Sequence, residues 1–264
     1  MFDTLYQIRY AECDLFGHLN HTGYFDYLQE GLLQAGGALG YGMERLQAEG
    51  YLPTITAASL EYLRPLFFRQ RIRLLPSLLE CGRYSCRLGI SFVPEGEEKP
   101  AARGEAELLL ARAGEPQPLP GVLHDRLCTL PAAEERVGLC LPDDTGHLPE
   151  SFAFRTERRV TSADTNPSGL MNMTAGISFF EDCGLSQCNS VGWPFTRMAE
   201  ENIGIVARRY TVRYLRPLPM DSRITIRTWL HSPRGAGIER HYSMVREGET
   251  TPSTLAHCLW IFFD

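Results

Sequence analysis

One stretch of the sequence, CDLFGHLNHTGYFDYLQE, gathers ionisable side chains directly before an apolar run. Asp14, His18 and His21 fall within eight positions, and Asn20 lies between the two histidines. A carboxylate can act as a general base or as a nucleophile, and an imidazole can orient or share a proton. Free backbone N–H groups at the start of a helix that begins near Thr22 can face a negatively charged oxygen. The stretch therefore predicts polar chemistry at the mouth of an apolar pocket.

Length and composition are those of an ordinary soluble globular protein. The chain has 264 residues, of which 44% are hydrophobic and 22% charged, with a net charge of −6 and a pI near 5.7. A phosphate-backbone partner needs a basic footprint, so we expect no nucleic acid to bind. The start, MFDTLYQIRY, does not resemble a signal peptide, and no apolar run is long enough to span a membrane. We therefore expect a cytoplasmic protein with no membrane partner.

The eight cysteines show no metal-binding spacing. They form no CxxC pair, and the two pairs five residues apart, Cys81/Cys86 and Cys183/Cys188, fall at unrelated places in the two halves of the chain. We interpret them as reduced thiols, and we predict neither a metal nor a cofactor.

An internal repeat organises the chain. YLRPL occurs at residues 62–66 and again at 214–218, an offset of 214 − 62 = 152. The same offset aligns Asn20 with Asn172 and EGE at 95–97 with EGE at 247–249, with no gap needed. The sequence therefore predicts an N-terminal domain (1–112), a proline-rich linker (113–151) with a short helix at Ala132–Val137, and a C-terminal domain (152–264).

Each copy reads as a strand, a helix and then further strands. In the first copy, Leu5–Tyr10 alternates like a half-buried strand, and helical apolar spacing starts at Thr22. Asn20 and Asn172 stand at N-cap positions, Gly36 and Gly37 are expected to end the first helix, and Met43–Glu49 is expected to form a second. Strand-like runs follow at Thr54–Leu63, Arg71–Leu79, Tyr84–Val93 and Gly104–Arg112, with Arg223–Leu230 and Leu255–Phe263 in the second copy. This order predicts an α+β fold in which an antiparallel β-sheet wraps around a central α-helix.

The pattern Asp-x3-His-x-Asn-x3-Tyr, carried by Asp14, His18, Asn20 and Tyr24, resembles the opening of hotdog-fold acyl-CoA and acyl-ACP thioesterases. Phe16 departs from the plant acyl-ACP pattern, which has Asn there. The resemblance implies a double hotdog that hydrolyses an acyl thioester of coenzyme A or acyl carrier protein, without a cofactor. It implies catalytic roles for Asp14 and His18, and substrate-binding roles for Asn20, His21, Thr22 and Tyr24.

Each of these residues also has a plainer interpretation. Asp14 can bind backbone amides in a turn, Asn20 can be a helix cap, and Tyr24 can be core packing. Arg64 and its counterpart Arg216 can support strand ends, with binding of coenzyme A phosphates as the alternative.

The second copy differs from the first at the positions of four candidate site residues. The counterparts of Asp14, His18, His21 and Tyr24 are Asn166, Leu170, Met173 and Gly176. Asn166 is not a base, so we predict one working site on the first copy; rescue by Asp164, which aligns with Glu12, is the alternative.

Two rival functions stay open from the sequence. One is a non-catalytic acyl-thioester binding protein, and the other is an acyl-thioester dehydratase or hydratase. Acyl length, the choice of carrier and the oligomeric state also stay open: the two copies form a pseudo-dimer within one chain, and a homodimer of double hotdogs is compatible with it.

Overall fold

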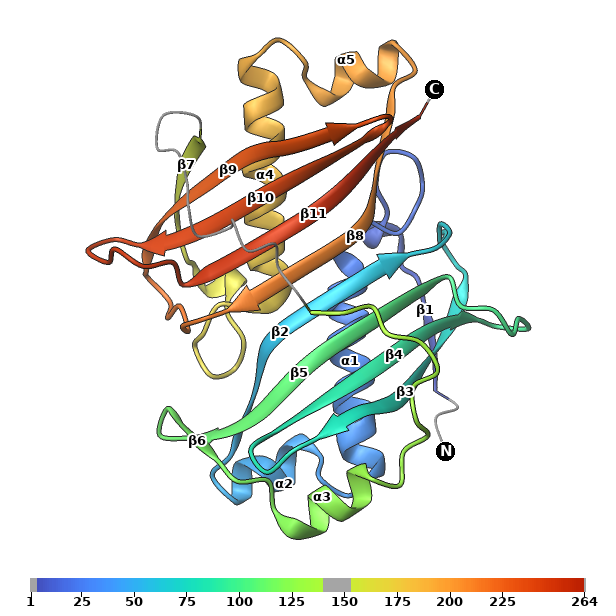
Figure 1. Ribbon diagram of the computed structural model, residues 1–264, viewed down its shortest axis with the longest axis vertical. Helices are drawn as coiled ribbons and strands as arrows, with labels where there is room; N and C mark the ends of the chain where they lie inside the picture. The colour runs from blue at the N-terminus through green and yellow to red at the C-terminus, as the bar shows by residue number, and fades with distance from the viewer. Residues whose placement is uncertain (1–3, 140–152, 264) are drawn as a thin grey trace. The chain divides into compact units, whose positions relative to one another are not determined.

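The computed structural model describes residues 4–139 and 153–263, and its internal contacts divide the chain into two compact units. Unit 1 comprises Met1–Leu139 and unit 2 comprises Cys140–Asp264. Within each unit, one long helix packs on an antiparallel sheet (Figure 1). The domain boundaries at residues 112 and 152 stay predictions, and the part of the expected linker from residue 140 onward lies outside the described residues.

The sheet of unit 1 is antiparallel, with strand order β1-β3-β4-β5-β2 and β6 paired with β5. Its strands are β1 (Leu5–Gln7), β2 (Leu52–Tyr62), β3 (Arg71–Cys81), β4 (Ser85–Pro94), β5 (Ala102–Arg112) and β6 (Glu115–Gln117). In β3, Ile72, Leu74 and Pro76 are buried while the residues between them are partly exposed. This alternation turns one face of the sheet towards a core.

Helix α1 (Gly23–Ala38) supplies the other half of that core. Its residues Phe25, Leu28, Leu32 and Ala35 are at most 6% exposed, and their spacing of three and four places them on one face. The helix contacts β3 and β4. Because α1 is buried along the sheet, its N-terminus is held in a defined place.

The helix ends later than we predicted. It continues through Gly36 and Gly37 to Ala38, and Gly40 with φ +73° ends it instead. The N–H of Gly40 bonds the carbonyl of Gly37 at 2.9 Å, and the N–H of Tyr41 bonds that of Gly36 at 2.8 Å, which is a Schellman motif. A residue with positive φ at this position stops a helix, whereas glycine within it only lowers helix propensity.

Unit 2 repeats the architecture of unit 1. Its strand order is β7-β9-β10-β11-β8, and helix α4 packs on β9 and β7. The elements are β7 (Phe154–Arg159), α4 (Met173–Ser190), α5 (Phe195–Glu200), β8 (Gly204–Tyr214), β9 (Arg223–Arg234), β10 (Gly237–Arg246) and β11 (Thr254–Phe263). The predicted α+β fold, with two copies of a sheet wrapped around a helix, is confirmed.

Two ion pairs occur at equivalent positions of both units. They join Arg45 to Glu49 and Arg64 to Glu97 in unit 1, and Arg197 to Glu201 and Arg216 to Glu249 in unit 2, at 2.5–3.3 Å. Each guanidinium also bonds a nearby backbone carbonyl. These contacts favour the structural interpretation of Arg64 and Arg216 over phosphate binding.

Two local predictions need correction, and a third is confirmed. Strand β1 ends at Gln7, because residues Tyr10–Glu12 form a 3₁₀ helix. No helix forms at Ala132–Val137; the helix of this region is α3 (Gly121–Leu127), whose Leu123 and Leu127 are buried. The predicted second helix is present as α2 (Met43–Ala48).

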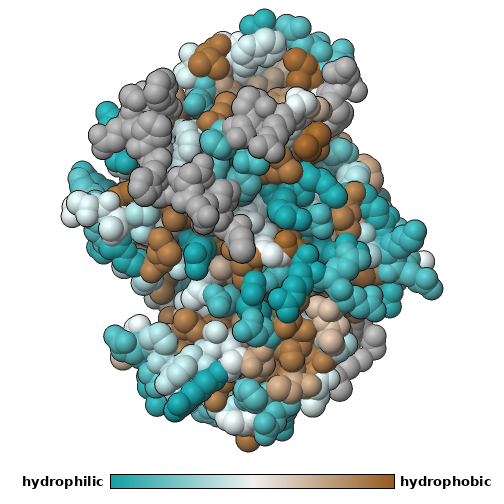
Figure 2. Space-filling view, viewed as in Figure 1, coloured by the Kyte–Doolittle hydropathy of each residue, from teal (hydrophilic) through white to brown (hydrophobic). Residues whose placement is uncertain are grey.

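Within the described residues, no helix is both long and apolar enough to cross a membrane. On the face shown in Figure 2, hydrophobic residues lie in small groups among hydrophilic ones.

The close approach of α1 to its sheet gives a stability prediction. A Cβ added at Gly31 would lie 3.0 Å from Ile90 Cγ2 and 3.3 Å from Leu74 Cβ, whereas one at the exposed Gly37 would meet nothing within 4 Å. We expect Gly31→Ala to be destabilising, because overpacking a core costs about 1–3 kcal/mol. We expect Gly37→Ala to stabilise by up to about 1 kcal/mol through helix propensity. Urea unfolding of both variants measures this, and a Gly31→Ala protein as stable as Gly37→Ala would contradict the packing described.

Candidate active site

The side chain of Asp14 closes the turn that precedes α1. Its Oδ1 accepts hydrogen bonds from the N–H groups of Phe16 (2.9 Å) and His18 (3.0 Å). The backbone N–H of Asp14 bonds the carbonyl of His18 at 2.7 Å, and Gly17 takes a φ of +76°. Oδ2 of Asp14 makes no hydrogen bond within the described part of the chain. One carboxylate oxygen therefore builds the turn, and the turn does not use the other.

Unit 2 builds the same turn with an amide. Oδ1 of Asn166 accepts from Ser168 N–H at 2.9 Å and from Leu170 N–H at 3.4 Å. Asn166 N–H bonds the Leu170 carbonyl at 2.8 Å, and Gly169 has a φ of +72°. Because an amide oxygen serves as well as a carboxylate oxygen, the charge of Asp14 is not required for this turn.

His18 lies beside the turn between two aromatic rings. Its ring centroid is 5.1 Å from that of Phe67, edge to face, and 6.3 Å from that of Phe16. Phe16 and Phe67 are 41% and 44% exposed, so His18 borders an apolar surface that water reaches. No hydrogen bond joins the side chains of Asp14 and His18 among the described residues. Such bonds commonly form only once substrate is bound.

The start of α1 leaves one amide available. Asn20 Oδ1 accepts from Thr22 N–H at 2.9 Å, and Asn20 O accepts from Gly23 N–H at 2.9 Å. The N–H of Phe25 bonds the Thr22 carbonyl at 3.0 Å. The intervening Tyr24 N–H has no acceptor in the part of the chain that the structure describes. This N–H sits in the first turn of the helix, where the helix dipole favours negative charge.

The two asparagines predicted as N-caps differ. Asn172 is the N-cap of α4, and its side chain accepts from Ala175 N–H at 2.7 Å, as predicted. The N-cap of α1 is Thr22 rather than Asn20, because Asn20 acts two residues earlier on the Thr22 amide. The hydroxyl of Thr22 also donates to Asn20 Oδ1 at 2.9 Å, so the two residues form one structural unit at the helix start.

His21 and Tyr24 line the buried side of the helix start. Tyr24 is 3% exposed and packs edge to face on Tyr62, whose hydroxyl donates to the His21 carbonyl at 2.9 Å. Burial lowers the pKa of His21 from its ordinary 6.5 to about 4, so this imidazole is neutral at pH 7. Burial raises the pKa of Tyr24, and the charge of Asp14 adds to that shift. Asp14 thus lies within electrostatic reach of the Tyr24 phenol.

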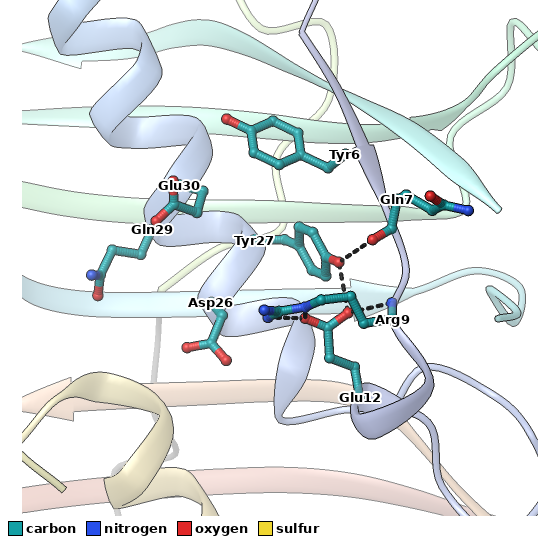
Figure 3. Close-up of a pocket in the computed structure, with 8 residues that line it drawn as sticks. All are labelled: Tyr6, Gln7, Arg9, Glu12, Asp26, Tyr27, Gln29 and Glu30. Carbon is teal, nitrogen blue, oxygen red and sulfur yellow. Dashed lines mark hydrogen bonds and ion pairs between the residues drawn. The ribbon is translucent and has the colours of Figure 1, made fainter. Parts of the chain in front are cut away.

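A cavity of about 470 Å³ opens on the other side of α1, and it contains none of the predicted site residues. It is lined by Tyr6, Gln7, Arg9, Glu12, Asp26, Tyr27, Gln29 and Glu30 (Figure 3). Inside it, Glu12 accepts hydrogen bonds from Arg9 Nε (2.7 Å) and from the Tyr27 hydroxyl (2.8 Å). Burial alone would raise the pKa of Glu12, but these bonds hold it below its usual range. The network ties the 3₁₀ helix to α1 and so supports the Asp14 turn from behind.

The corresponding carboxylate of unit 2 has a local structural role. Asp164 Oδ2 accepts from the N–H and the hydroxyl of Thr161 at 2.8 and 2.6 Å, which caps the 3₁₀ helix Ser162–Asp164.

Two clusters of potential metal ligands were not predicted from the sequence. One joins Cys81, His124 and Cys128 in unit 1, and the other joins Glu239, His241 and His257 on neighbouring strands of unit 2. Within each cluster, one donor atom per residue lies within 4.8 Å of the others. Glu239 and His241 are two residues apart on β10, so their side chains share one face of the sheet. His257 on β11 pairs with His241. The sequence does not reveal this cluster, because the register between the two strands must be known.

The comparisons with known proteins place the chain in a family. Residues 8–127 and 160–264 match the family model of the thioesterase-like superfamily, and the chain therefore belongs to that superfamily. Both copies of the repeat are matched. No curated protein sequence matches the chain.

Solved structures share the fold over the whole length. A putative oleoyl thioesterase from Lactobacillus plantarum is 13% identical, with a TM-score of 0.77 over 99% of this chain and 96% of that one. An acyl-ACP thioesterase from Bacteroides thetaiotaomicron (12% identical, TM-score 0.72) covers 98% and 96%. The 12:0-ACP thioesterase from Umbellularia californica (12% identical, TM-score 0.74) covers 98% and 93%. At these identities the likeness shows the double hotdog fold, as predicted.

The low pKa of His21 gives a prediction for stability against pH. The folded state disfavours the charged imidazole, so the contribution of His21 is fully present above pH 6.5 and is lost as the pH falls towards 4. Between pH 7 and pH 5 this loss is about 2 kcal/mol. Met173 occupies the equivalent position in unit 2, which makes His21→Met a matched control. Urea unfolding at both pH values should show a smaller loss for His21→Met than for the unmodified chain; equal losses would refute the assignment.

Proposed function

We propose that the chain hydrolyses an acyl thioester of coenzyme A or acyl carrier protein, at one site on unit 1. The observation that carries the proposal is the carboxylate of Asp14, in a turn that unit 2 closes with the amide of Asn166. A charge that the turn does not need, retained beside the start of a buried helix, favours a chemical role. Membership of the thioesterase-like superfamily supports a hydrolase.

In the proposed reaction, Asp14 acts as the general base. Its carboxylate removes a proton from a water molecule whose oxygen attacks the thioester carbonyl carbon. The carbon–sulfur bond then breaks, and the departing thiolate takes up the proton, which leaves a free acid and a free thiol. General-base assistance is worth about 10²–10⁴ in rate.

The N–H of Tyr24 is the proposed donor to the carbonyl oxygen as negative charge develops on it. It lies in the first turn of α1 and has no acceptor within the described residues. One such donor is worth about 10²–10³ in rate. No metal or cofactor is needed for these steps.

The other predicted residues shape the entrance. His18, between Phe16 and Phe67, orients the thioester at the apolar rim, and Asn20 and Thr22 hold the helix start in place. The three solved relatives are a putative oleoyl thioesterase, an acyl-ACP thioesterase and a 12:0-ACP thioesterase, which favours an acyl group as the part of the substrate that the apolar side receives.

We propose that unit 2 has no catalytic activity of its own. Asn166 cannot take a proton from water, Leu170 has replaced the imidazole of His18, and Asp164 is engaged in capping its own 3₁₀ helix.

The test is the Asp14→Asn variant. We expect kcat/KM to fall by about 10²–10⁴-fold, because the base is lost. We also expect the folded structure to persist, because Asn166 closes the same turn in unit 2. Release of free thiol from a panel of acyl-CoA and acyl carrier protein thioesters measures the first, and circular dichroism with thermal unfolding the second.

The matched control is Asn166→Asp, which places the same charge in the turn of unit 2. It should leave turnover unchanged, because Leu170 and Met173 remain. Retention of most of the turnover by Asp14→Asn would overturn the proposal, and so would binding of acyl thioesters without thiol release by the unmodified chain.

A further inference from the structure

Three metal-ligating side chains of unit 1 lie together at the end of β3. Cys81 is the last residue of that strand, His124 lies in α3, and Cys128 is the C-cap of α3. A sulfur or nitrogen atom from each lies within 4.8 Å of the other two. His124 and Cys128 are four residues apart, which places them on one face of the helical turn. Figure 1 shows α3 near the end of β3.

The chain around the cluster is held in place without a ligand. The N–H of Leu78 bonds the carbonyl of Pro131 at 2.8 Å, and the N–H of Ala133 bonds the carbonyl of Leu78 at 3.0 Å. On the other side, Nη1 of Arg126 bonds the Leu39 carbonyl at 2.6 Å. Because both sides of α3 are anchored to the unit, the three side chains meet in a preformed geometry.

The donor set suits a soft divalent ion. Thiolate and imidazole ligands together are typical of zinc, with bonds of about 2.3 Å to sulfur and 2.0–2.1 Å to nitrogen. Donor atoms of a tetrahedral site with these bonds are about 3.5–3.8 Å apart. The separations of up to 4.8 Å in the cluster therefore require each donor to move by no more than about an ångström.

The cluster is open to solvent on one side. Cys128 is exposed and His124 is half-buried, so an ion can enter from water.

We propose that Cys81, His124 and Cys128 bind one Zn²⁺ ion, with the fourth coordination position open to solvent. The ion joins the end of β3 to the segment that leaves the sheet of unit 1, and it thereby stabilises that connection. This site shares no residue with the proposed thioesterase site, so the two proposals stand or fall separately.

The experiment uses the full chain, reduced and freed of metal with a chelator. Zn²⁺ is titrated in competition with a chromophoric chelator, and we expect one equivalent to bind. Removing a residue that hydrogen-bonds a metal ligand typically weakens metal binding 10–100-fold. Removing a ligand itself should therefore weaken zinc binding by at least about 100-fold. Cys128→Ser and His124→Asn, which alter exposed and half-buried positions, should both show this loss with unchanged circular dichroism.

Cys188→Ser is the matched control, since this half-buried thiol lies in unit 2 and outside the cluster. It should bind Zn²⁺ like the unmodified chain. Replacement of zinc by Co²⁺ should give thiolate-to-cobalt charge-transfer absorption in this control, and that absorption should be weakened in Cys128→Ser. The proposal fails if the reduced chain takes up no zinc, or if Cys128→Ser binds zinc as tightly as the unmodified chain does. A chain that binds no zinc when reduced, and in which peptide mapping finds a Cys81–Cys128 disulfide, would show that the two thiols pair with each other instead.

Discussion

The hydrogen bonds that a side-chain oxygen accepts from the backbone before each long helix are the constraint on which the candidate site depends. In unit 1, Oδ1 of Asp14 gathers two amides, and Leu19, just after this turn, pairs with Leu66 through its N–H at 2.7 Å. Each such bond contributes about 0.5–1.5 kcal/mol. Together they set the path of the chain into α1, so the free carboxylate oxygen and the first turn of the helix keep fixed positions within the unit.

The internal repeat allows the two units to be compared position by position. Features that both units keep have structural roles. They are the ion pairs of Arg45 and Arg197, the helix-ending Gly40 and Gly192, and the turn closed by Asp14 or Asn166. Positions that have diverged while the backbone is kept are those whose chemistry the fold does not demand. Four such positions lie close to the start of α1, where Asp14, His18, His21 and Tyr24 are replaced by Asn166, Leu170, Met173 and Gly176, and this divergence supports the proposed site.

Much of this arrangement could be predicted from the sequence, because its signals are local or periodic. The repeat, the apolar face of α1 and the alternation in β3 follow directly from spacing. The failures share a cause: α3 in the expected linker, and the cluster of Cys81 with His124 and Cys128, depend on contacts between residues more than forty positions apart. The end of α1 was misplaced because Gly36 and Gly37 read as breakers, although the positive φ belongs to Gly40.

The burial of His21 bears on the charge at the start of α1. Desolvation lowers the pKa of His21 to about 4, so this imidazole carries no charge at pH 7. The Tyr24 phenol is also uncharged, because burial raises its pKa. The Tyr24 N–H in the first turn of α1 is then the group proposed to stabilise a developing oxyanion, without a charge contributed by His21. Met173, which is buried, takes this position in unit 2, so the titration of His21 has no counterpart there.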